Sequence, residues 1–130
     1  MSDARAAEAC PCGSGGTYDA CCGALHRGEP AKSAEALMRS RYTAYVRGDA
    51  DYILRTWHPR ERPKSLTLGK DGIVWTSLTV HAHRVTGKNK AVVEFSAHYR
   101  GPDGRTAILG EKSRFLREDG AWLYLDGDAL

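Results

Sequence analysis

All four cysteines of the chain lie in one short segment, and their spacing is typical of a metal site. Residues 10–23 read C-P-C-G-S-G-G-T-Y-D-A-C-C-G, which places the thiols on Cys10, Cys12, Cys21 and Cys22. The glycines between the two cysteine pairs permit the positive φ angles that a sharp chain reversal requires. Zinc accepts four thiolates tetrahedrally at about 2.3 Å, and such a shell leaves no position open for water. The segment therefore predicts a structural metal site with zinc as the expected occupant.

Two alternatives concern the oxidation state of the thiols and the identity of the metal. Four cysteines could instead form a disulfide framework. Residues 1–9 are polar and lack the apolar run of a secretory signal, and no segment approaches the ~20 apolar residues of a membrane span. We therefore expect a cytoplasmic protein with reduced thiols. Iron competes with zinc because a four-thiolate site suits both metals.

Residues 10–23 resemble the SEC-C motif, the small zinc-binding element at the C-terminus of the SecA translocase and on other bacterial proteins. The resemblance rests on C-P-C-G-S-G, the following tyrosine and C-C-G. It implies a protein partner, with the translating ribosome and the secretion apparatus as the candidates. SEC-C elements usually carry lysines around the tyrosine. This chain has Gly16, Thr17, Asp19 and Ala20 there, which weakens the expectation of an acidic partner or an anionic lipid.

The rest of the chain resembles the YchJ-type family. The resemblance is carried by residues 33–45, by W-H-P at 57–59, by S-R-F at 113–115 and by residues 122–127. It implies a cone similar to that of nuclear transport factors, in which helices pack into the concave face of a curved antiparallel sheet. Where this pattern would read His-Glu before S-R-F, the chain reads Gly110-Glu111-Lys112, so the resemblance supplies no acid–base pair on that strand.

Length and charge fit one small domain with an attached metal element. The chain has 130 residues and a net charge of +3, and its lysines and arginines are interspersed with acidic residues. No basic stripe that could neutralise a run of phosphates is visible, so the charge pattern gives no support for a nucleic-acid partner. We assign residues 1–28 to the metal-binding element and residues 29–130 to an α+β domain, because Gly28 and Pro30 interrupt any periodicity between them.

Local signals predict two helices followed by four strands. Ser33 is a good N-cap and Gly48 a good stop for a helix over residues 34–47. A second helix is expected from the cap Asp49 through Trp57, because Pro59 forbids its continuation. Turn residues separate the strands, so the predicted fold is an α+β cone with helices packed on a curved four-stranded antiparallel sheet. The strands are expected at residues 74–85, 91–99, 107–117 and 122–126.

Arg41 lies within the apolar stripe of the first predicted helix, four residues from both Leu37 and Tyr45. It should therefore point inward. One interpretation is that Arg41 is snorkelling or held by Glu111 or Asp126, because a buried charge persists only when it is paired. The other is that the guanidinium grips a carboxylate or phosphate ligand in a pocket of the cone. The candidate pocket residues are Arg41, Glu111, Tyr124 and Asp126.

Histidines offer weaker candidates for chemistry. His58 could transfer protons, but at a predicted helix end it more readily caps the last carbonyls. His81 and His83 are two residues apart on a predicted strand and should share a face. With His98 they form either a solvent-facing row or an incomplete metal site. No nucleophile triad, phosphate loop, dinucleotide fingerprint or paired-carboxylate pattern is present, so an enzyme is the less favoured class.

Two functions from different classes are consistent with this sequence. The favoured one is a non-enzymatic zinc-binding adaptor whose metal element contacts a protein partner. Since Tyr18 and Leu25 are its only bulky apolar side chains, this element should contribute little to the stability of the cone. The alternative is a small-molecule binder or an enzyme that uses the pocket of the cone. A filled cone beside an exposed metal loop favours the adaptor, and an enclosed pocket lined by Arg41, Glu111 and Asp126 favours the small-molecule function.

Overall fold

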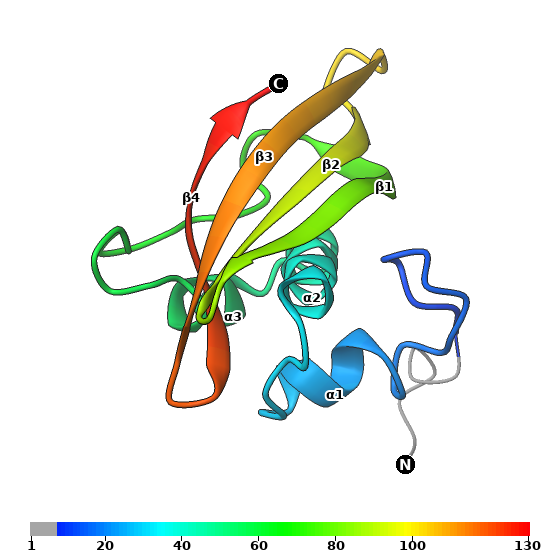
Figure 1. Ribbon diagram of the computed structural model, residues 1–130. Coiled ribbons are helices and arrows are strands. Elements are labelled where there is room, and N and C mark those ends of the chain that lie inside the picture. The colour runs from blue at the N-terminus through cyan, green and yellow to red at the C-terminus, as the bar shows by residue number, and fades with distance from the viewer. Residues whose placement is uncertain (1–7) are drawn as a thin grey trace.

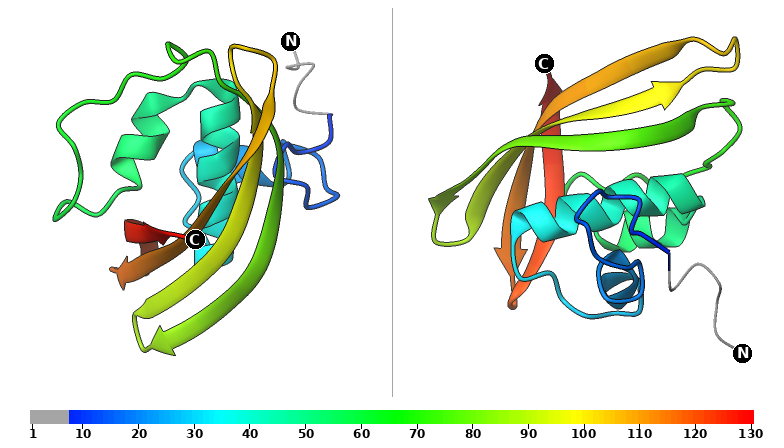
Figure 2. Two further views of the ribbon diagram at one scale, coloured as in Figure 1. Left: turned by 90° about the horizontal axis from the view of Figure 1, so that it is seen from above. Right: turned by 90° about the vertical axis from the view of Figure 1, so that its right-hand side faces the viewer.

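The computed structural model describes residues 8–130, which fold as three helices on the concave side of a curved four-stranded antiparallel sheet (Figure 1). The strands follow one another in the order β1-β2-β3-β4. Figure 2 shows the sheet curving over α2, with β4 descending beside the helices. The predicted α+β cone is confirmed. Its elements are α1 (Cys22–His26), α2 (Ala34–Arg47), α3 (Ala50–Arg55), β1 (Val74–Gly87), β2 (Lys90–Arg100), β3 (Thr106–Glu118) and β4 (Ala121–Ala129).

Helix α2 has the predicted bounds, whereas α3 ends two residues earlier than expected. Ser33 accepts a hydrogen bond from the Ala36 amide at 3.1 Å, and Gly48 closes α2 with a φ of 74°. The helix prediction through Trp57 is wrong because the chain leaves α3 to pair with β4. The Tyr124 amide donates to the Thr56 carbonyl at 2.9 Å, and the Tyr124 carbonyl accepts from the His58 amide at 2.7 Å. The short helix α1 was not predicted.

The sheet follows the predicted meander but contains register shifts that change which residues share a face. In β1 the register shifts between Val80 and Ala82. His81 consequently contacts the Ser96 hydroxyl at 2.7 Å, whereas His83 lies opposite the buried Val93. The prediction that His81 and His83 share a face is therefore wrong, because the extra residue of a bulge reverses the alternation of a strand.

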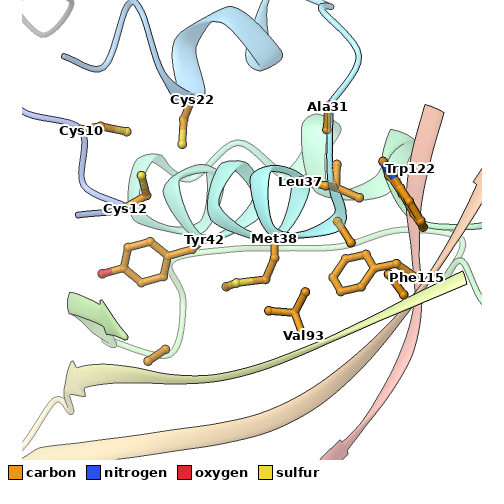
Figure 3. Close-up of a cluster of buried hydrophobic side chains, with 13 residues drawn as sticks. Cys10, Cys12, Cys22, Ala31, Leu37, Met38, Tyr42, Val93, Phe115 and Trp122 are labelled. Carbon is orange, nitrogen blue, oxygen red and sulfur yellow. The ribbon is translucent and has the colours of Figure 1, made fainter. Parts of the chain in front are cut away.

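Helix α2 is buried on two sides. Figure 3 shows Cys10, Cys12 and Cys22 on one side of the helix and Val93 and Phe115 of the sheet on the other. The cysteines and the sheet residues thus belong to one continuous core. The buried residues of α2 are Ala34, Leu37, Met38, Ser40, Arg41, Tyr42, Thr43 and Ala44. Within residues 8–130, the helices are all too short or too polar to cross a bilayer.

Candidate functional site

The four cysteines form a cluster whose dimensions fit a tetrahedral metal ion. Their sulfur atoms all lie within 4.8 Å of one another, and all four thiols are free. The Sγ atoms of Cys12 and Cys21 are 3.6 Å apart, and those of Cys21 and Cys22 are 4.0 Å apart. Four sulfurs placed tetrahedrally at 2.3 Å from one ion are separated by about 3.8 Å. The donor set and its spacing therefore fit a four-thiolate metal site.

Two local turns bring the cysteine pairs together. The first is closed by the Cys10 amide, which donates to the Gly16 carbonyl at 2.9 Å, and by Gly13, whose φ is 79°. The second pair lies at the start of α1, where the Tyr18 carbonyl accepts from the amides of both Cys21 and Gly23. A Cβ on Gly23 would lie 2.7 Å from that carbonyl oxygen, so glycine is required for this turn.

Helix α2 contacts the cysteine cluster through the side chains of Thr43 and Arg39. Thr43 is fully buried, and its hydroxyl donates to Cys22 Sγ at 3.3 Å and lies 3.8 Å from Cys10 Sγ. Arg39 Nη1 donates to the Cys12 carbonyl at 2.7 Å. Hydrogen bonds from the side chains of Cys12 and Cys22 lower the pKa of Cys10 and favour its thiolate, while the contact with Cys10 raises the pKa of Cys22. A central cation would stabilise all four groups as thiolates.

A cavity of about 300 Å³ lies on the other side of α2, between this helix and the sheet. Met38 and Phe115 lie at its buried end, and Leu109, which is 44% exposed, lies at its mouth. Aromatic side chains dominate the wall. They are Tyr42, Tyr45, Trp57, Trp75, Phe95, Phe115 and Tyr124.

Arg41 projects into this cavity from α2 and is only 6% exposed. Its Nη1 donates to the Ile53 carbonyl at 2.8 Å and to the Thr56 hydroxyl at 2.7 Å. The guanidinium carbon lies 4.6 Å from the ring centre of Tyr124 and 5.2 Å from that of Trp57. Burial lowers the pKa of Arg41 to about 10, so the side chain remains charged at neutral pH.

Glu111 lines the same cavity from β3. Its Oε2 accepts hydrogen bonds from the Ser113 hydroxyl and, at 3.1 Å, from the Tyr124 hydroxyl. Burial, followed by the nearby charge of Glu111, raises the pKa of Tyr124 and keeps its hydroxyl protonated as a donor. No ion pair within 4.0 Å joins Glu111 to Arg41 in residues 8–130. The predicted ion pair of Arg41 with Glu111 is therefore wrong, although the charge of Glu111 still acts to raise the pKa of Arg41 against the effect of burial.

Both the cysteine segment and the cone match known protein families. Residues 33–127 match the family model described as the YchJ middle NTF2-like domain, and residues 7–24 match the SEC-C motif. A UPF0225 protein of Xanthomonas campestris is 46% identical over 127 residues, covering 97% of this chain and 98% of its own length. A UPF0225 protein of Deinococcus radiodurans is 52% identical over 118 residues, covering 90% and 86%. The chain belongs to the YchJ family.

Solved structures support the same assignment. The solution structure of a SEC-C motif containing protein from Rhodopseudomonas palustris matches with a TM-score of 0.82 and 37% identity, covering 93% of this chain and 98% of the other. A crystal structure of a SEC-C motif containing protein from Psychrobacter arcticus matches with a TM-score of 0.77 and 28% identity, covering 94% and 82%. In this YchJ-family chain, the SEC-C cysteines and the sheet of the cone both pack against α2 (Figure 3).

Asp126 is the one predicted pocket residue that lies elsewhere. Its carboxylate pairs with Arg114 Nε at 2.5 Å, and it is absent from the cavity wall. The register of β4 shifts at this point, so that Tyr124 pairs with Phe115 while Asp126 pairs with Arg114. Because the bulge places Asp126 on the outer face of the sheet, the prediction that it neutralises Arg41 is wrong.

Two histidines have structural roles that the sequence did not reveal. His26 Nδ1 accepts from the Tyr18 hydroxyl at 2.7 Å, and its Nε2 donates to the Ser40 carbonyl at 2.8 Å, which joins α1 to α2. His58 does not cap a helix. Its Nε2 contacts Glu118 at 2.6 Å, and its Nδ1 accepts from the Arg60 amide.

Three residues that contact the cysteine cluster or Glu111 were not predicted from the sequence. Thr43 and Ser113 were not identified because a small polar residue in a helix or strand has no distinctive pattern. Gly127 carried a usable signal, since a glycine inside a strand often marks the close approach of another group. A Cβ at this position would lie 2.8 Å from Cγ of Glu111. Gly127 therefore provides the space in which the Glu111 side chain lies.

Proposed function

We propose that this protein binds a small organic molecule in the cavity of its cone, and that a metal ion in the cysteine cluster braces the N-terminal element against the same helix. The observation that carries the proposal is the aromatic cavity of about 300 Å³ with the buried Arg41 in its wall. This volume lies at the lower end of the range of small-molecule sites, roughly 300–1,000 Å³.

The residues that line the cavity indicate a binding site and not a packing defect. Open volume in a core lowers stability, and a void left by imperfect packing would be lined by apolar groups alone. Here a charged arginine and a carboxylate face the space, and each is held in place by other side chains. Arg41 is buried and Glu111 is half-buried, and charges withdrawn from water are costly to maintain, so their position in the cavity supports recognition of a polar group on a ligand.

Zinc is the metal that we propose for the cluster, with iron as the alternative. Four thiolates at these separations form a closed tetrahedral shell, which supplies structural crosslinking and no catalytic water. A reducing cytoplasm would keep the thiols available for the metal. Elemental analysis of protein purified without chelator should find about one zinc or iron per chain.

The geometry supports ligand binding better than the adaptor role. The adaptor role predicts a filled cone beside an exposed metal loop. Instead, Cys10, Cys12 and Cys22 are 5%, 0% and 2% exposed and pack on α2. The proposals of the ribosome or the secretion apparatus as partner rest on the resemblance to SecA alone.

A fragment screen with a filled-cavity variant tests the proposed function. Ala97 lines the cavity from β2, so Ala97→Leu should occupy part of the space. His98→Leu places the same side chain at the next position of the strand, on its other face. Fragments that bind saturably to the wild type and to His98→Leu, but not to Ala97→Leu, would support the proposal. Equal binding to all three proteins, or no saturable binding, would contradict it.

A further inference from the structure

Arg41 presents one unused edge of its guanidinium. Both hydrogen bonds that this group donates within residues 8–130 come from Nη1, to Ile53 and Thr56. Nε and Nη2 are therefore the donors left over. These two N–H groups point to the same side of the planar group and form the fork that matches the two oxygens of a carboxylate. The rings of Tyr124 and Trp57 lie against the guanidinium and restrict its rotation.

Glu111 presents an acceptor to the same cavity. Ser113 and Tyr124 both donate to Oε2, and no donor within residues 8–130 reaches Oε1. The absence of a side chain on Gly127 allows the carboxylate to lie against β4. The cavity therefore contains a fixed anion as well as a fixed cation, and the two do not touch each other.

The two charges lie between apolar surfaces. In the register of β2 and β3, Phe95 pairs with Glu111, with Ala97 and Leu109 one step nearer the mouth. Along α2, Met38 lies one turn deeper than Arg41, and Tyr45 lies one turn nearer the mouth. A ligand that reaches both charges must therefore also place an apolar body against aromatic rings.

Charge balance selects the kind of ligand. A simple carboxylate bound to Arg41 would bring a second anion close to Glu111, and a simple amine bound to Glu111 would bring a second cation close to Arg41. A molecule with both groups on one carbon supplies each charge with its opposite. We propose that the cavity binds a zwitterion with an aromatic body, of the size and chemistry of an aromatic α-amino acid, with its carboxylate on Arg41 and its ammonium on Glu111. This inference rests on the ligand-binding function proposed above and specifies its ligand.

Four matched probes test the proposal by calorimetric or NMR titration of the full chain. L-phenylalanine carries both charges and the ring, 3-phenylpropanoate lacks the ammonium, 2-phenylethylamine lacks the carboxylate, and L-alanine lacks the ring. L-phenylalanine should bind about tenfold or more tightly than each of the other three. Binding should be lost in Ala97→Leu.

Two conservative variants assign the contacts. Glu111→Gln removes the anion and should reverse the preference, so that 3-phenylpropanoate binds more tightly than L-phenylalanine. Arg41→Lys keeps the charge but removes the fork, and it should weaken the two carboxylates while leaving 2-phenylethylamine within about twofold. Asp126→Asn removes a carboxylate from the outer face of the same sheet and should leave all affinities unchanged. Unfolding curves of each variant establish that it is folded.

The outcomes separate the ligand class from the binding function. Equal or tighter binding of 3-phenylpropanoate or 2-phenylethylamine to the wild type would overturn the zwitterion and leave the cavity as a binding site. The same conclusion follows if none of the four probes binds while other fragments bind in a manner that Ala97→Leu abolishes. If no compound binds in the cavity, the zwitterion and the proposed function both fail.

Discussion

The Thr43 hydroxyl donates to the Cys22 sulfur at 3.3 Å and so joins the cavity helix to the cysteine cluster. Thr43 lies on α2 only two residues from Arg41, whose side chain lines the cavity on the other side of the helix. The metal element and the cavity are thus supported by opposite sides of one helix. Changes in the cysteine cluster should therefore alter the stability of the cone.

Removal of the metal should destabilise the whole domain. The free thiols of Cys10, Cys12 and Cys22 would remain buried against α2 after the loss of their cation. We expect chelation or Cys22→Ser to lower the free energy of unfolding by about 2–4 kcal/mol. Denaturant unfolding followed by circular dichroism measures this effect. An unchanged transition of the sheet would restore the view that the metal element contributes little to the cone.

Thr43→Val should weaken retention of the metal. Valine has a similar shape but cannot donate a hydrogen bond to sulfur, and hydrogen bonds to charged groups contribute about 1.5–3 kcal/mol. We expect a loss of stability of that order and faster transfer of the metal to a competing chelator. Thr79→Val is the matched control, because Thr79 is exposed on β1, outside the cysteine loop. Identical transfer rates for the two variants would exclude a role for the Thr43 hydroxyl.

Gly127→Ala should displace Glu111 from its place beside β4. The added methyl group would meet Cγ of Glu111 at 2.8 Å, so one of the two must move. A cost of about 1–3 kcal/mol is expected from this overpacking, together with weaker ligand binding. Gly110→Ala on β3 is the control, since its methyl group would meet only the side chain of the terminal Leu130, at 3.2 Å. If urea unfolding gives the same midpoint for both variants, the space at Gly127 is not required.

His26 should make stability depend on pH. Desolvation by burial lowers the pKa of His26 below its ordinary value, and the hydrogen bond that the ring donates to the Ser40 carbonyl only partly opposes this shift. The unfolded state then binds more protons than the folded state as the pH falls below about 6.5. The stabilising contribution is fully present above that pH and is lost as the pH falls through the folded pKa.

Comparison with His26→Gln isolates this contribution from acid release of the metal, which should affect both proteins. The wild type should be the more stable protein at pH 7.5, and the difference in unfolding free energy should shrink towards pH 5. A difference that stays constant across this range would show that His26 does not titrate on unfolding.

Features that depend on neighbours in the chain were accessible from the sequence. The spacing of Cys10, Cys12, Cys21 and Cys22 predicted a metal cluster, because short glycine-containing turns suffice to bring them together. Helix α2 begins and ends where Ser33 and Gly48 predicted, since caps act on the backbone within one turn. The hairpins likewise followed from turn residues between apolar runs, and with them the order of the sheet.

Features that depend on a partner strand or on packing were decided by the tertiary structure. The bulges near His81 and Leu125 reversed the faces assigned to His83 and Asp126, because a bulge is defined by the register against the neighbouring strand. Arg41 donates to the Ile53 carbonyl in α3 and to the hydroxyl of Thr56, the residue that follows α3. The sequence pattern of α2 does not encode these partners. The open cavity was also beyond the sequence, since it depends on how the volumes of side chains from α2 and four strands fill one space.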